Sequence, residues 1–218
     1  MFKRTLSLAL FSLILATGYS QSVHGDREKN WKELYRATPD QVFDLRHTRL
    51  SVKFDFAKRQ LNGEEWVTLR PHFYAQNTLT LDAKSMIIRE VKLNGKDLVY
   101  HYDGSKLDIT LDKTYERKDS LELYIKYTAR PEDVKQKGSA AITGAKGLYF
   151  IDPDDTDPKK PTQVWTQGET EASSCWFPTI DVPGQKTTQE IAMTVPQRFT
   201  TLSNGTLVSQ APDRKSVV

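Results

Sequence analysis

Two carboxylates, Glu169 and Glu171, lie between Trp165 and an apolar run that begins at Trp176. A carboxylate in a partly closed cleft can pair with a positively charged amine, and it loses less of that attraction to solvent than a surface acid does. Most glutamates in proteins are simply solvated. The residues by themselves therefore leave Glu169 open between an amine-binding role and an ordinary surface role.

No catalytic constellation is visible in the sequence. A zinc peptidase site needs two histidines one helical turn apart and a glutamate that acts as base, as in His-Glu-x-x-His. None of the four histidines is followed by Glu, and no two are four residues apart; they are His24, His47, His72 and His101. The sequence also lacks a Gly-x-Ser-x-Gly elbow and a phosphate-binding glycine-rich loop. We predict no catalytic residue and no metal ligand in this chain.

Cys175 and the segment 152–161 each have a structural and a functional interpretation. Cys175 is the only cysteine, so no intramolecular disulfide can form, and no histidine lies close enough in sequence to activate it. We expect a packed thiol. The acidic segment 152–161, DPDDTDPKKP, resembles a calcium loop only in its acids, because the glycine and the glutamate of that loop are missing. A solvated turn is the favoured interpretation, with calcium binding as the alternative.

The elements that must position these residues are strands. In segment 50–56, apolar Leu50, Val52 and Phe54 alternate with polar residues, the pattern of a half-buried strand. Similar short segments recur near 65–69, 79–81, 87–93, 121–127 and 189–196. Asn94-Gly95 and Asp103-Gly104 fall between such segments and predict type I′ hairpin turns, in which both central residues have positive φ. The predicted fold is all-β, an antiparallel, saddle-like β-sandwich.

The N-terminus has the pattern of a secretory signal. Lys3 and Arg4 precede an apolar stretch over residues 6–16, and Gly18 and Ser20 occupy the small-residue positions before a cleavage site. The stretch is too short to span a membrane, which takes ~20 residues. We expect a signal peptide over residues 1–20 and a periplasmic or extracellular location; a buried N-terminal helix is the alternative. A lead-in segment, 21–43, follows it.

Composition excludes several classes of protein. A hydrophobic share of 38% and a charged share of 27% are typical of a folded globular domain. The formal net charge is only +3, and two of the cations lie in the expected signal peptide. No basic cluster occurs elsewhere, so we expect neither a nucleic-acid partner nor an acidic membrane surface.

Segment 166–183 reads TQGETEASSCWFPTIDVP, and other short motifs occur in a fixed order around it. They are a strand at 49–56 with a turn at 60–63, the Asn94-Gly95 turn, the run 147–150, and the run 201–205. In this order they resemble the N-terminal β-domain of the aminopeptidase N family of zinc peptidases. The resemblance implies that such a domain covers residues 44–209, with 210–218 as a truncated end or the start of a linker.

The resemblance also implies roles for two residues. In the family, the acid or amide at the position of Glu169 binds the free α-amino group of the substrate, which restricts cleavage to the N-terminal residue. Gln167 either supports the loop or faces the same pocket. Many members have an arginine where Ser174 or Cys175 stands, so this chain departs from the family there.

The implied partners are the N-terminus of a peptide as substrate and a zinc catalytic domain in cis. Zinc belongs to the full-length enzyme, and this chain is expected to bind none. The hypothesis is that the chain is the substrate-binding domain of an exported zinc aminopeptidase and is inactive alone. The alternative is a free-standing secreted β-sandwich that binds a ligand or another protein. The first hypothesis predicts an exposed apolar face, which a second domain would cover.

Overall fold

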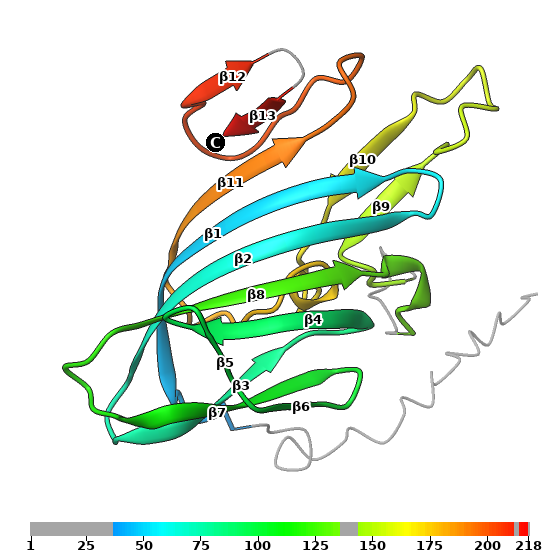
Figure 1. The fold of residues 1–218 in the computed structure, drawn as a ribbon. Helices are drawn as coiled ribbons and strands as arrows, with labels where there is room; N and C mark the ends of the chain where they lie inside the picture. The colour runs from blue at the N-terminus through cyan, green and yellow to red at the C-terminus, as the bar shows by residue number, and fades with distance from the viewer. Residues whose placement is uncertain (1–36, 136–143, 212–213, 218) are drawn as a thin grey trace, which may run out of the picture. The chain divides into compact units, whose positions relative to one another are not determined.

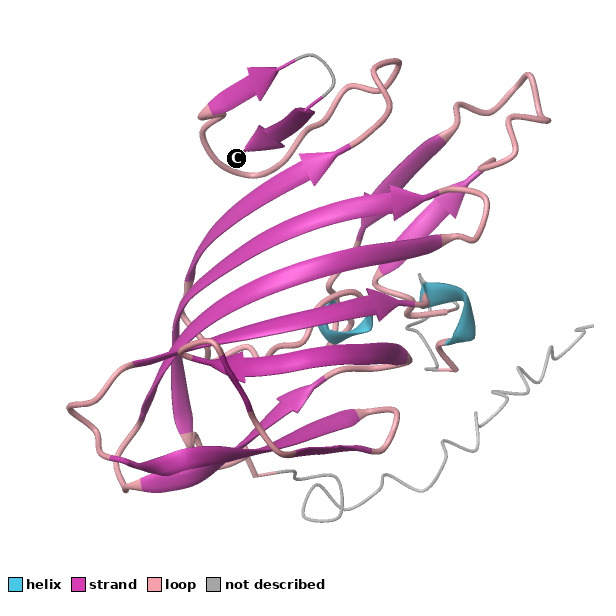
Figure 2. Cartoon of the chain, in the orientation of Figure 1, coloured by secondary structure: helices cyan, strands magenta, loops and turns pink. Residues whose placement is uncertain are grey.

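Strands make up nearly all the regular structure of residues 37–135, 144–211 and 214–217, which the computed structural model describes (Figures 1 and 2). In chain order the strands are β1 (Phe43–Asp55), β2 (Gln60–Pro71), β3 (Gln76–Asp82), β4 (Met86–Leu93), β5 (Lys96–Asp97), β6 (Tyr100–Tyr102), β7 (Lys106–Tyr115), β8 (Leu121–Ala129), β9 (Leu148–Ile151), β10 (Gln163–Thr166), β11 (Thr188–Thr194), β12 (Ser209–Ala211) and β13 (Arg214–Val217). Two short 3₁₀ turns, η1 (Pro131–Asp133) and η2 (Ser173–Cys175), complete the list. The expected signal peptide lies outside the described residues.

The strands of the unit 41–218 form three sheets. The largest has the order β12-β13-β11-β1-β2-β8-β4-β5, the second is β3-β7-β6, and the third is the pair β10-β9 (Figure 1). The all-β prediction is confirmed. One pair departs from the expected antiparallel arrangement, because β11 runs parallel to β1, with Leu50 beside Ile191. Only strands joined by a tight turn are forced to be antiparallel, and a long connection separates these two in sequence.

The core follows from the alternation of side chains along the central strands. Val67 on β2 and both Leu123 and Ile125 on β8 are fully buried, on the same face of the large sheet. They belong to one apolar cluster with Leu81 of the three-stranded sheet and Leu148 of β9. Removal of this apolar surface from water is the main favourable term in folding.

The two predicted turns differ in their outcome. Asn94 and Gly95 have φ of 52° and 77°, which confirms a type I′ turn between β4 and β5. At the second turn only Gly104 has positive φ, so the type I′ prediction for Asp103-Gly104 is wrong. The Asp103 carboxylate accepts hydrogen bonds from the amides of Ser105 and Lys106, both at 2.7 Å, and this capping favours a longer loop.

The alternation along β2 places an acid, Glu65, on the same inward face as Val67 and Leu69. Glu65 on β2 has no exposed surface, and both of its carboxylate oxygens lack a hydrogen-bond partner. The hydroxyl of Tyr127, on the adjacent strand, is also buried and unpartnered. The Tyr127 ring fills the space beside Gly63, where a Cβ atom would lie 2.3 Å from ring carbon Cζ. Burial raises the pKa of Glu65 well above its ordinary value of 4.5, which favours the neutral acid.

Replacement of Glu65 by leucine should therefore stabilise the domain, by ~2 kcal/mol at pH 8, because an unsatisfied buried polar group is removed. Because folding raises the pKa of Glu65, the penalty for ionising this buried acid is absent below about pH 4.5 and grows, so that stability is lost, as the pH rises through the folded-state pKa. Urea unfolding at pH 5 and pH 8 should show a larger gain for Glu65→Leu at pH 8.

The control is Glu122→Leu, which changes an exposed acid on β8 and should not alter the pH dependence. A Glu65→Leu variant that is less stable than wild type at both pH values would contradict the prediction.

Candidate functional site

The site begins where the two-stranded sheet ends. β9 and β10 pair from Leu148–Thr166 to Ile151–Gln163, and Trp165 stacks on Tyr149 with the ring centroids 4.5 Å apart. The amide of Gln167 then donates to the carbonyl of Gly147 at 2.9 Å, which extends the pairing by one bond. The hairpin therefore fixes the backbone at the residue where the loop 167–187 begins.

Two glycines let this loop fold tightly against the hairpin. Gly147 has φ of +70°, and a Cβ atom there would lie 2.0 Å from the carbonyl oxygen of Ala172. A Cβ atom at Gly168 would lie 2.7 Å from Oγ of Ser173. The amide of Ala172 donates to the carbonyl of Gly168 at 3.0 Å, which closes a turn around the residues between them. A side chain at Gly147 would push the loop off the hairpin, whereas one at Gly168 would meet the Ser173 side chain within the loop.

The turn presents the two residues that the sequence singled out. Nε2 of Gln167 lies 3.5 Å from Oε2 of Glu169, and the amide donates to the carboxylate. Gln167 is half-buried, whereas Glu169 and Glu171 are exposed, and the Glu169–Thr170 peptide bond is cis. A carboxylate with a neighbouring amide can accept the hydrogen bonds of an ammonium group. An exposed pair of this kind contributes only about 0–1 kcal/mol, so strong binding here needs further cover from solvent.

Behind the turn lies a patch of small, buried side chains. Ala172, Ser174 and Cys175 have no exposed surface, and the Ser174 hydroxyl has no hydrogen-bond partner. Sγ of Cys175 donates to the carbonyl of Ala145 at 3.5 Å, and burial raises the pKa of this thiol to about 11. The prediction of a packed thiol is confirmed, because a nucleophilic cysteine needs a lowered pKa.

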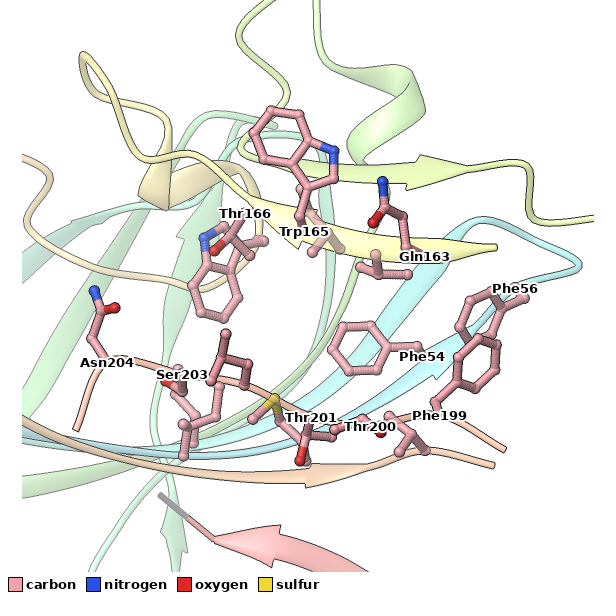
Figure 3. Close-up of a pocket in the computed structure, with 18 of the residues that line it drawn as sticks. Phe54, Phe56, Gln163, Trp165, Thr166, Phe199, Thr200, Thr201, Ser203 and Asn204 are labelled. Atoms are coloured by element: carbon pink, nitrogen blue, oxygen red, sulfur yellow. The ribbon is translucent and has the colours of Figure 1, made fainter. Parts of the chain in front are cut away.

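A groove that the sequence did not reveal runs beside β10. Its volume is about 730 Å³, and it lies between the inner face of β1 and β11, the strand β10, and residues 195–204. Figure 3 shows Phe54, Gln163 and Thr166 around it, with Ser203 and Asn204 on the opposite side. Alternate apolar side chains of β1 and β11 form one wall of the groove. The remaining walls come from segments that only the tertiary structure brings together.

The described residues do not offer a zinc site. No group of three His, Cys, Asp or Glu in the ranges 37–135, 144–211 and 214–217 could hold a metal ion. Nδ1 of His72 lies 2.5 Å from the carboxylate of Asp44, and Nδ1 of His47 lies 2.8 Å from the Thr188 hydroxyl. These histidines have structural partners, and no step of chemistry follows from them.

Comparison with known proteins identifies the class. The sequence model of the family described as Peptidase M1 N-terminal domain matches residues 42–218. The chain belongs to this family, and its N-terminal-domain resemblance to zinc aminopeptidases is confirmed.

Individual relatives are distant. The chain is similar to leukotriene A-4 hydrolase of Xenopus laevis, with 24% identity over 191 residues that cover 83% of the chain and 29% of the hydrolase. Its fold is similar to that of an M1 zinc metallopeptidase from Deinococcus radiodurans, with a TM-score of 0.66 at 16% identity over 80% of this chain and 38% of that one. Native yeast LTA4 hydrolase gives a TM-score of 0.64 at 18% identity, over 87% and 30%. The chain thus spans well under half the length of these relatives.

The close approach at Gly147 can be tested by substitution. Gly147→Ala should destabilise the domain by ~2 kcal/mol, since alanine is strained at positive φ and its Cβ would overlap the Ala172 carbonyl. Gly184→Ala, in the same loop, is the matched control, because a Cβ there meets nothing within 4 Å. Urea unfolding followed by tryptophan fluorescence measures both. Equal stability of the two variants would contradict the proposed packing of loop on hairpin.

Proposed function

We propose that this chain is the N-terminal domain of an exported zinc aminopeptidase, in which Glu169 binds the α-amino group of a peptide substrate. The observation that carries the proposal is the family match over residues 42–218 together with an exposed Glu169 whose carboxylate lies 3.5 Å from the Gln167 amide. Pairing of Glu169 with an ammonium group would fix the register of the peptide and so select its N-terminal residue. Gln167 would orient the carboxylate.

The hydrolytic chemistry belongs, in this proposal, to a zinc catalytic domain in cis. Zinc bound there would activate water and polarise the scissile carbonyl. Relatives of similar fold include zinc metallopeptidases. The present chain contributes substrate binding and by itself hydrolyses nothing.

Exposed apolar residues near the C-terminal end of the described chain support a covering domain. Leu202 is 93% exposed and Val208 75% exposed, and Leu207 lies between them in sequence and is also exposed. Side chains of this kind, clustered on one segment, favour a surface that another polypeptide covers.

Export is proposed from the signal pattern of residues 1–20. Among the described residues, no helix is both long and apolar enough to cross a membrane. The N-terminal sequence of the mature protein would identify the cleavage site, which we expect before Gln21.

The size of the mature protein in its native cells tests the proposal most directly. An antibody raised against residues 44–209 should detect a species several times larger than 24.9 kDa, and this species should contain zinc and release N-terminal amino acids from peptides. A species slightly below 24.9 kDa without aminopeptidase activity would overturn the proposal. That result would favour the alternative of a free-standing binding module.

In the active species, Glu169→Ala should lower kcat/KM for a dipeptide at least tenfold, because the ammonium group loses its charged partner. Glu122→Ala removes an exposed acid on β8 and serves as the control. Steady-state kinetics with alanyl-alanine separates the two variants. Equal kcat/KM for Glu169→Ala and the control would exclude the amine-binding role.

A further inference from the structure

The loop that carries Glu169 is hydrogen-bonded to the turn between β3 and β4, which belongs to neither strand of its own hairpin. The turn between β3 and β4 consists of Ala83, Lys84 and Ser85, and Lys84 contacts the loop twice. Its amide donates to the Ser174 carbonyl at 2.7 Å, and its ammonium Nζ donates to the Glu171 carbonyl at 2.5 Å. The two acceptors lie on either side of Ala172 and Ser173, so one residue holds both the end of the turn and the middle of η2.

A second set of bonds anchors the distal part of the loop to the end of β3. Asp82 and Thr179 exchange backbone hydrogen bonds of 2.7 and 2.9 Å. Oδ2 of Asp82 accepts from the amide of Asp181 at 3.1 Å, and Oδ2 of Asp181 accepts from the amide of Ser174 at 2.9 Å. The loop therefore returns to the same support that Lys84 provides.

The supporting turn is itself braced. The amides of Ala83 and Ser85 donate to the carbonyls of Ser105 and Gly104, at 2.8 and 2.9 Å. The hydroxyl of Tyr102 donates to the Ala83 carbonyl at 2.7 Å and accepts from the Met86 amide at 2.8 Å. These bonds tie the β3–β4 turn to the three-stranded sheet, so displacement of Lys84 would break several bonds together.

We propose that Lys84 is a positioning residue for the Glu169 loop: its ammonium group, bound to the Glu171 carbonyl, fixes the direction in which the Glu169 carboxylate points. Only Thr170 separates the residue of the bound carbonyl, Glu171, from Glu169, which is close enough to determine the conformation of the turn. The Lys84 ammonium donates to the Glu171 carbonyl and does not pair with the Glu169 carboxylate. Glu169 makes no ion pair among the described residues. The carboxylate is thereby left free for an amine from outside. The amine-binding part of the proposal rests on the proposed function; the anchoring part does not.

Three variants of the full chain separate the charge of Lys84 from its bulk. Lys84→Met keeps most of the aliphatic chain and removes the donor, whereas Lys84→Arg keeps a charged donor. Lys96→Met, on β5, removes an exposed lysine for which the structure gives no side-chain partner, and it is the matched control. Circular dichroism checks that each variant is folded.

Hydrogen exchange measures the anchor. Amides of residues 169–176 should exchange about tenfold faster in Lys84→Met, since a hydrogen bond from a charged donor is lost. They should exchange at nearly the wild-type rate in Lys84→Arg and in Lys96→Met. An unchanged rate in Lys84→Met would overturn the proposal.

Nuclear magnetic resonance titration measures the consequence for binding. The probes are alanyl-alanine amide and its N-acetylated form, which lacks the ammonium group. Resonances of Gln167 and Glu169 should shift with the free amine only, and the dissociation constant should rise about threefold in Lys84→Met, within the range of an exposed pair, and recover in Lys84→Arg. Unchanged affinity in Lys84→Met would overturn the positioning role, and so would weaker binding without faster exchange, because Lys84 would then act on the ligand directly.

The two proposals fail in distinguishable ways. Faster exchange in Lys84→Met, with a wild-type chain that does not discriminate between the two probes, would overturn amine binding by Glu169 and support the anchor. Discrimination between the probes that is insensitive to Lys84→Met would support the proposed function and overturn the positioning role.

Discussion

The pairing of β2 with both β1 and β8 is the constraint on which the rest of the structure depends. The inward positions of β2 are fully buried at Leu61, Val67 and Leu69. A register shift of one residue would turn Glu64 and Trp66 into the core instead. Since β1 also pairs with β11 along its other edge, this register determines where β11 begins. The loop that leads to β11 is thus fixed at its far end by the same ladder that builds the core.

Between its two fixed ends, the loop has no regular structure except η2, so its backbone groups must find partners individually. Buried amides and carbonyls without a partner are costly. The end of β3 and the β3–β4 turn provide the partners: Asp82 is bonded to Thr179, and Lys84 is bonded to Ser174 and Glu171. The conformation of the loop is therefore determined by the three-stranded sheet as much as by its own sequence.

Local patterns predicted β1, β2 and β8 because alternation reports burial on one face. The Asn94-Gly95 turn was predictable because its φ angles require those residue types. The parallel direction of the β1–β11 pair was not predictable, since strands in a parallel and in an antiparallel ladder show the same alternation. The family resemblance singled out Glu169 and left the role of Gln167 open, and nothing in the sequence indicated the bonds of Lys84: 87 residues separate Lys84 from the carbonyl that its ammonium binds. Patterns within a short stretch of sequence cannot reveal a contact between residues that lie so far apart in the chain.

The exposure of Glu169 limits what this domain can contribute to the proposed function. A carboxylate in contact with bulk water attracts an ammonium group by about 0–1 kcal/mol, so the domain alone binds an amine weakly. The same pair becomes several times stronger when a second surface excludes water. The exposed Leu202 and Val208 are suited to receive such a surface. On this view the domain supplies geometry, a carboxylate held in one direction, and a weak affinity for the peptide N-terminus, which the covering domain strengthens.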